Sequence, residues 1–361
     1  MTNFGTCKLH ASTRRHIMAM YRTGIVGGRR GVHHARRYEG IENMKVIAIC
    51  EIDEERLKAA VEELNIPGYT DYVEMLEKEK PDIVHAVTEP TVPRHIWVEP
   101  AAAADVKALV IEKPLALRPS EAEALAAAHE KTGLKIIVNH QRRYLPFAEK
   151  LLEFFADDSL GDIHFIRACT EGDITDMDTH LMDVVLFALK DIPITHVWGA
   201  VQGAEIYDVP HRQCPEDLMA IYTFENGARV FFESARTAFG TIDFPGSNPR
   251  CNLDFWGTKG RMWWRENGSW GYQFDGMSEH FVEPTHFGED DRFGQRDFTQ
   301  AIATWLDDEN QPHRNRLEYA LLGFDLIMAA YRSALIGRRI EWPPKLSDEE
   351  WVELKNRVTG S

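Results

Sequence analysis

The first 140 residues alternate short apolar runs with longer segments of helical periodicity, and this alternation limits the possible folds more than any other feature. The runs VIAIC and IIV are apolar throughout, as expected for strands that helices cover on both faces. Such alternation is typical of a parallel sheet with crossover helices. The sequence therefore predicts an α/β domain with a doubly wound parallel sheet over residues 18–140.

The pattern changes after about Asp162, where strand-like segments follow one another across short turns such as ENG and TKG. This spacing predicts a mostly antiparallel sheet, and the helical segments around it predict an α+β domain over residues 141–361. Residues 1–17 are expected to be an N-terminal extension. The reason is that Met18 and Met20 stand directly before the first predicted strand, and either can be the true start.

The charge balance argues against polyanionic partners. The chain has 57 acidic and 41 basic residues, a formal net charge of −16, which repels nucleic acid and anionic membranes.

The five cysteines are scattered without a C-x-x-C pair, which indicates reduced thiols and no structural zinc. No apolar run approaches the ~20 residues of a spanning helix. We expect a cytoplasmic protein with a small-molecule partner; the basic start of the chain leaves organelle targeting open as an alternative.

A glycine-rich stretch, GIVGGRRGVHHARR, joins the first predicted strand to the first helix. Its second half keeps the G-x-x-G spacing of a dinucleotide-binding turn, whereas the upstream part is one residue short. Gly27 can form the tight turn, Gly28 can let the backbone approach a pyrophosphate, and Gly31 can let the helix pack closely. The pyrophosphate is then expected at the helix start. The alternative is an ordinary glycine-rich turn.

The cofactor preference rests on Glu51, which ends the second predicted strand 20 positions after Gly31. A carboxylate there can accept hydrogen bonds from the adenosine ribose and repels a 2′-phosphate, so NAD is expected and NADP is disfavoured. Arg29 and Arg30 can lend positive charge to the cofactor phosphates. Alternatively, Arg29 and Arg30 are two solvated arginines at a helix start with no role in cofactor binding.

Two later motifs complete a recognisable order. EKP, residues 112–114, ends a predicted strand, and DMDTHLMD places Asp176, His180 and Asp183 on one face of a helix start. Together with the G-G-x-x-G-x-x-H turn, these motifs resemble the glucose-fructose oxidoreductase, inositol dehydrogenase and rhizopine-catabolism (Gfo/Idh/MocA) family. The resemblance covers nearly the whole chain. It implies a Rossmann domain, a second domain with a large open sheet, and nicotinamide-dependent oxidation or reduction of sugars, cyclitols and related polyols.

The resemblance implies that Lys113, Asp176 and His180 form the catalytic group. Histidine is suited to take the hydroxyl proton as hydride leaves a secondary alcohol, because its ordinary pKa of ~6.5 is near neutrality. Asp176 can orient the imidazole, and Lys113 can stabilise the alkoxide. Each residue also has an ordinary alternative: Asp176 can cap a helix, His180 can be a buried polar residue, and Lys113 can be a surface lysine. A metal site in DMDTHLMD is a weaker alternative, since acidic residues favour a helix start without an ion; we expect no metal.

One segment departs from the family. TEPTVPRHIW is one residue longer than the family's T-P-N turn beside the nicotinamide, so Thr88, Pro90 and His95 are expected at the cofactor in an altered geometry. Pro100 falls within the helix expected next, where it should break a backbone hydrogen bond and kink the chain.

The substrate pocket is expected between the sheet face and the helix that carries His180, with NHQRRY matching the family's N-R-R-F-like turn. Tryptophans of the sheet can stack on a sugar ring, although core or interface positions are the stronger alternative; these are Trp198, Trp256, Trp263, Trp264 and Trp270. The expected substrate-binding residues are Lys113, Arg142, Arg143, Tyr144, Asp176 and His180. The expected cofactor-binding residues are Gly27, Gly28, Arg29, Arg30, Gly31, Glu51, Thr88, Pro90, His95, Glu112 and Lys113. An open sheet also favours a homodimer or homotetramer.

The leading prediction is an NAD-dependent dehydrogenase that acts on a secondary alcohol of a sugar, cyclitol or sugar derivative. One alternative is an enzyme that retains NAD and cleaves glycosides through transient oxidation and elimination. Another is a non-catalytic cofactor-sensing regulator, which the presence of Lys113, Asp176 and His180 disfavours.

Overall fold

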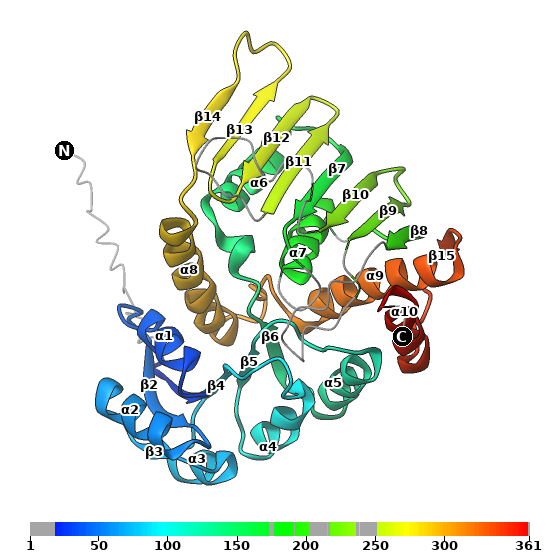
Figure 1. Cartoon of the computed structure of the whole chain (residues 1–361). Coiled ribbons are helices and arrows are strands. Elements are labelled where there is room, and N and C mark those ends of the chain that lie inside the picture. The colour runs from blue at the N-terminus through cyan, green and yellow to red at the C-terminus, as the bar shows by residue number, and fades with distance from the viewer. Residues whose placement is uncertain are drawn as a thin grey trace, which may run out of the picture.

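The protein contains two sheets with helices packed between and around them, as the computed structural model in Figure 1 shows. The structure describes residues 19–172, 177–190, 192–201, 215, 217–235, 238 and 251–359. The predicted N-terminal extension, residues 1–17, lies outside these ranges. Met18, Asp173 and Asp176 also lie outside them, so the structure gives no position for the predicted catalytic aspartate.

The N-terminal sheet has six strands in the order β3-β2-β1-β4-β5-β6, and every neighbouring pair is parallel. The chain builds outward from β1 first on one side and then on the other, so the predicted doubly wound sheet is confirmed. The central strands β4 and β5 are buried along their whole length because helices cover both faces. The strands are β1 (Tyr21–Val26), β2 (Met44–Cys50), β3 (Gly68–Tyr69), β4 (Ile83–Ala86), β5 (Ala108–Ile111) and β6 (Lys135–Val138).

The helices of this part follow the strands in alternation. Asp53 and Asp71 cap two of them by accepting a hydrogen bond from the third helical amide, which is the usual role of aspartate at that position. The helices are α1 (Arg30–Arg37), α2 (Glu54–Leu64), α3 (Tyr72–Glu79), the 3₁₀ helix η1 (Arg94–Trp97), α4 (Val98–Ala103) and α5 (Pro119–Thr132).

The segment around Pro100 differs from the expected single kinked helix. It consists of η1 followed by the short α4, and Pro100 lies in the first turn of α4. Amides of a first turn have no acceptor within their own helix, so a proline is accommodated there without loss of a helical hydrogen bond.

The second sheet has nine strands in the order β14-β13-β12-β11-β7-β10-β9-β8-β15, and only β7 and β10 pair in parallel. The prediction of a large, mostly antiparallel sheet is confirmed. In β9 the residues alternate between buried and exposed, since helices cover one face of the sheet. The strands are β7 (Ile163–Thr170), β8 (Ile194–Val201), β9 (Leu218–Phe224), β10 (Arg229–Ser234), β11 (Cys251–Gly257), β12 (Gly260–Arg265), β13 (Ser269–Phe274), β14 (Phe281–Pro284) and β15 (Ile340–Glu341).

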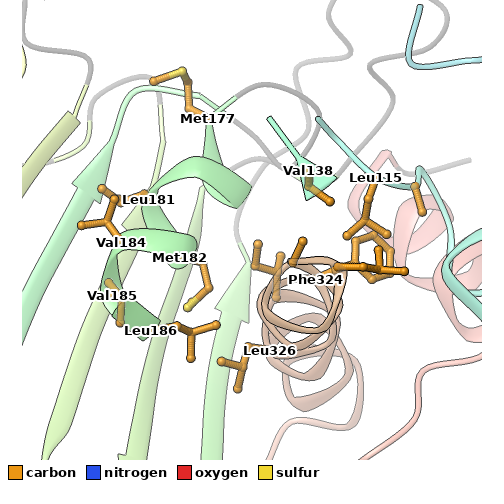
Figure 2. Close-up of a cluster of buried hydrophobic side chains, with 14 of the residues drawn as sticks. Leu115, Val138, Met177, Leu181, Met182, Val184, Val185, Leu186, Phe324 and Leu326 are labelled. Carbon is orange, nitrogen blue, oxygen red and sulfur yellow. The ribbon is translucent and has the colours of Figure 1, made fainter. Parts of the chain in front are cut away.

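A shared apolar core joins the two parts. Figure 2 shows Phe324 and Leu326 of α9 between side chains of α7 and side chains of the N-terminal part, Leu115 and Val138. This continuous packing fixes α7, which carries His180, relative to the N-terminal sheet. The helices here are the 3₁₀ helix η2 (Gln141–Tyr144), α6 (Pro146–Ala156), α7 (Asp178–Leu189), α8 (Phe287–Asp307), α9 (Leu317–Ile336) and α10 (Asp348–Thr359).

Helix α9 is the one helix of the described chain that is long and apolar enough to cross a membrane. It lies in the interior instead, with 61% of its most apolar window buried inside the protein. The division between domains at residue 140 stays a prediction; β6 ends at Val138 and η2 begins at Gln141.

Candidate functional site

The glycine-rich stretch forms a tight turn between β1 and α1. Gly27 has a φ of +106°, and a Cβ on it would lie 2.1 Å from the carbonyl oxygen of Val87. A Cβ on Gly31 would lie 2.8 Å from Cγ2 of Ile25, so α1 packs directly on β1 at this point. The shortened turn therefore keeps the backbone geometry that the predicted roles of both glycines require.

Glu51 lies against this turn at the end of β2. Its Oε2 accepts a hydrogen bond from the Gly28 amide at 2.7 Å, and its Oε1 accepts one from the Asp53 amide at 3.1 Å. Carboxylate oxygens can accept more than one hydrogen bond, so the ribose hydroxyls of a dinucleotide still find acceptors here. The geometry suits NAD, because a 2′-phosphate would meet this negative charge.

The two arginines of the turn differ in surroundings. The Arg29 side chain is 70% exposed and its Nη2 lies 3.5 Å from Oε1 of Glu89, as expected for a solvated arginine. Arg30 is also exposed, and its charge contributes to the lowered pKa of both His34 and His180. The role of either arginine at a bound phosphate stays a prediction.

Glu112 of the EKP motif is buried within a polar cluster at the carboxyl edge of the N-terminal sheet. Its Oε1 accepts a hydrogen bond from Nδ2 of Asn139 at 2.7 Å and lies 3.4 Å from Nε2 of His34 and 3.5 Å from Nε2 of His85. Burial alone would raise the pKa of Glu112, but these neighbours outweigh it and hold the pKa well below its usual range. Glu112 is therefore an ionised buried carboxylate. It joins α1, β4 and the end of β6, and it directly precedes Lys113.

The same cluster has the composition of a metal site, since the ligand atoms of His34, His85 and Glu112 lie within 4.8 Å of one another. Asn139 already donates to the carboxylate oxygen that both imidazoles face. Burial also lowers the pKa of His34 to about 4, so its ring is neutral and can act as a hydrogen-bond donor near neutrality. The contacts favour a hydrogen-bonded cluster, and the absence of a metal stays a prediction.

Arg94 was not predicted as a site residue, yet it organises the loop after β4. Its guanidinium is buried and donates to Oγ1 of Thr88 and the carbonyl oxygen of Glu89 at 2.8 Å, and to the carbonyl oxygen of Val92 at 3.0 Å. It also donates to the carbonyl oxygen of Glu112 at 3.2 Å. Thr88 and the EKP strand end are thereby held by one side chain. Pro90 lies within this loop, and His95 follows Arg94 in η1.

His180 lies in the first turn of α7 and is buried. Burial, followed by the charges of Arg142, Lys113, His140 and Arg30, lowers its pKa well below the usual value. Lys113 is far from His180 in the sequence, yet its charge contributes to the lowered pKa of the imidazole. The imidazole is therefore neutral before reaction and has a nitrogen that can accept a proton, while burial and the nearby cations oppose a lasting positive charge on the ring.

The three η2 residues predicted to bind substrate have different environments. Arg142 is buried and donates to Oε1 of Glu266 at 2.7 Å, while its Nε and Nη1 have no partner among the described residues. Arg143 donates to Oδ2 of Asp183 at 2.8 Å and to two backbone oxygens. The Tyr144 hydroxyl accepts the amide hydrogen of Arg314. These bonds favour a packing role for Arg143 and Tyr144 over the predicted substrate contact, and they leave Arg142 as the substrate candidate.

The carboxylates of DMDTHLMD that the structure describes face protein groups. Asp178 accepts a hydrogen bond from the Ser234 hydroxyl, and Asp183 accepts from Arg143 and Asn315. A metal site in this motif therefore finds no support from these two carboxylates.

The tryptophans divide between core and surface. Trp264 is buried and stacks on Phe147 with ring centroids 4.5 Å apart, and Trp270 is also buried. The core alternative therefore holds for these two. Trp198 is exposed on β8 beside Met219 and Ile221 of β9, which gives the sheet an apolar outer patch.

Residues 21–140 match a family model, GFO_IDH_MocA, described as an oxidoreductase family with an NAD-binding Rossmann fold. Two curated relatives agree with this match. The chain is 28% identical over 198 residues to D-apiose dehydrogenase of Paraburkholderia graminis, which covers 48% of the chain and 52% of that protein. It is 22% identical over 258 residues to myo-inositol 2-dehydrogenase of Thermotoga maritima, which covers 67% of the chain and 74% of that protein. The chain thus spans about half the length of the first relative.

Two solved structures share the fold over nearly their whole length. An oxidoreductase from Agrobacterium radiobacter, in complex with NAD+, L-tartaric acid and magnesium, superposes with a TM-score of 0.75 at 18% identity, over 90% of this chain and 98% of that one. Levoglucosan dehydrogenase, in complex with NADH and levoglucosan, gives a TM-score of 0.75 at 17% identity, over 90% of this chain and 100% of that one. At these identities the likeness supports the arrangement of both sheets.

Proposed function

We propose that the chain is a member of the Gfo/Idh/MocA oxidoreductase family and an NAD-dependent dehydrogenase that oxidises a secondary alcohol of a sugar, cyclitol or sugar derivative. The observation that carries the proposal is the position of His180, a buried imidazole whose pKa is lowered by burial and by the charges of Arg142 and Lys113. The influence of Lys113 on His180 supports a base and a cation that act at one site.

The residues of the turn fit the cofactor. Gly27 and Gly31 allow close approach of the backbone, and Glu51 offers acceptors beside the Gly28 amide. NAD supplies the hydride acceptor when bound. The preference for NAD over NADP rests on the negative charge of Glu51.

The chain's own residues supply the proton chemistry. His180 takes the hydroxyl proton, which it can do over a wide pH range because burial and neighbouring cations keep it neutral. Lys113 stabilises the negative charge that develops on the oxygen. We expect Asp176 to orient the imidazole of His180, as the family resemblance implies.

The proposal is tested with purified protein, NAD+ and a panel of sugars, cyclitols and glycosides, with absorbance at 340 nm as the measure of NADH. NADH formation with a polyol supports it, and loss of that activity in Lys113→Ala with cofactor binding intact assigns the site. Cleavage of a glycoside without net NADH would point instead to the NAD-retaining elimination.

The assembly and the location are part of the proposal. Trp198, Met219 and Ile221 are 39%, 38% and 41% exposed on the outer face of the nine-stranded sheet, which supports a homodimer or homotetramer through this face. Light scattering after size exclusion tests it, with Ile221→Lys as the disrupting variant. We also propose a cytoplasmic enzyme without nucleic-acid or membrane partners; the described cysteines are buried and form no disulfide with one another.

A further inference from the structure

We propose that His140 receives the proton that His180 takes from the substrate, and that Asp183 stabilises the resulting imidazolium. The proposal rests on the dehydrogenase function proposed above and extends it by a proton relay. His140 is a positioning residue in this scheme, because it acts through His180 and does not touch the substrate.

His140 lies between His180 and a carboxylate. It precedes η2, is 1% exposed, and its ring packs edge to face on the ring of His180 with centroids 5.2 Å apart and an interplanar angle of 61°. On its other side, Nδ1 lies 3.6 Å from Oδ1 of Asp183. The order of the three groups is that of a base, a second imidazole and an orienting carboxylate.

The hydrogen bonding of these groups is incomplete at the positions that a relay needs. Neither ring nitrogen of His140 has a hydrogen-bond partner within the described chain, and Nδ1 of His180 has none there either. Asp183 uses Oδ2 for Arg143 and Asn315, and its Oδ1 faces Nδ1 of His140. Buried polar atoms are normally paired, so the unpaired Nε2 of His140 and Nδ1 of His180 call for a functional explanation.

The charges around the two histidines favour transfer in one direction. His180 is faced by Lys113, by Arg30 of α1 and by Arg142 of η2, which oppose a second proton on its ring. His140 lies against Asp183, a carboxylate that can stabilise an imidazolium. Burial raises the pKa of Asp183, yet Arg143 and the contact with His140 outweigh burial, lower the pKa and keep this carboxyl ionised.

The proposed step conserves protons and electrons. His180 begins with its proton on Nδ1. It accepts the hydroxyl proton of the alcohol at Nε2 while the carbon that bears this hydroxyl gives its hydride to NAD+. Nδ1 of His180 then passes its proton to Nε2 of His140, directly or through one water. His140 keeps the proton on Nδ1 that faces Asp183 and becomes an imidazolium. Two electrons leave the alcohol as hydride, and one proton ends on His140.

The test uses His140→Phe, which keeps a flat ring and removes both nitrogens, and His140→Ala, whose cavity can take added imidazole. We expect kcat for alcohol oxidation to fall about tenfold or more in both variants, and the solvent deuterium isotope effect on kcat to change. Imidazole should restore activity to His140→Ala. The matched control is His129→Phe on α5, whose Nδ1 contacts the Leu134 carbonyl oxygen, and it should behave as wild type.

A wild-type kcat and isotope effect in His140→Phe would overturn the relay, as would a fallen kcat that imidazole cannot restore in a folded His140→Ala. If the variants do not fold, nitrogen NMR of the wild-type protein with NAD+ decides: in the neutral rings the proton should lie on Nδ1 of both His180 and His140, and a proton on Nε2 of either ring overturns the proposal. Failure of the wild type to form NADH with any polyol concerns the proposed function alone, because the positions of these protons do not depend on turnover.

Discussion

Replacing Gly27 by alanine tests whether the shortened turn binds the dinucleotide, and the chain offers a matched control. Gly27 and Gly133 both have positive φ, +106° and +66°. The left-handed conformation of Gly133 costs an alanine about 1–2 kcal/mol, and Gly27 lies outside that region, where an alanine is more strained. A Cβ on Gly133 meets nothing within 4 Å, whereas a Cβ on Gly27 would lie 2.1 Å from the Val87 carbonyl oxygen. Both variants therefore carry backbone strain, and the clash belongs to Gly27 alone.

The clash must be relieved by movement of the turn or of the end of β4, since the facing atom is backbone. Val87 is also tied to β1, because its amide donates to the Val26 carbonyl oxygen at 2.7 Å. We expect Gly27→Ala to weaken NAD binding at least tenfold, about 1.4 kcal/mol, and to lower the free energy of unfolding by more than Gly133→Ala does. Gly133→Ala should keep the wild-type Kd.

The assay is the Kd for NAD+ by isothermal titration, together with urea unfolding of both variants. If Gly27→Ala binds NAD+ with the wild-type Kd while it remains folded, the turn does not hold the dinucleotide. Equal losses of affinity in the two variants would attribute the effect to general destabilisation.

Three further predictions follow from charges and burial. Glu51→Gln should reduce the preference for NAD+ over NADP+ in kcat/KM, because it removes the negative charge beside the Gly28 amide; an unchanged ratio would contradict the role of Glu51. The free energy of unfolding should fall as the pH drops from 6.5 toward about 4, because the folded state lowers the pKa of His34 to about 4 and the unfolded state therefore binds more protons in this range. It should fall further below 4.5, because the folded state also lowers the pKa of Glu112. In Glu112→Gln the slope below 4.5 should be shallower, as chemical unfolding at several pH values can show. Treatment with a chelator should leave turnover and stability unchanged, and loss of either would indicate an ion at His34, His85 and Glu112.

Much of the fold was predictable because it depends on local patterns. Apolar runs such as VIAIC became buried parallel strands, and the short turns near ENG and TKG became the antiparallel sheet. Asp162 marks the change closely, since β7 begins at Ile163. The helix around Pro100 was less predictable, because the length of the preceding loop decides where the helix starts.

The site was predictable only where a motif carries it. Lys113 and His180 come from motifs, whereas the neighbours that set their environment come from strand register. His85, Glu112 and Asn139 meet because β4, β5 and β6 end side by side at one sheet edge. Arg94 and His140 have no sequence signal of their own, since a buried charge is recognisable only from its partners.

The central claim is that His180 and Lys113 perform alcohol oxidation with NAD+. The most direct measurement is NADH formation at 340 nm across a panel of sugars and cyclitols, with wild type, Lys113→Ala and His180→Asn compared at equal NAD+ saturation. We predict turnover of at least one polyol by the wild type and a loss of about 10²-fold or more in each variant with the Kd for NAD+ preserved. Wild-type rates in both variants, with NAD+ bound, would contradict the assignment.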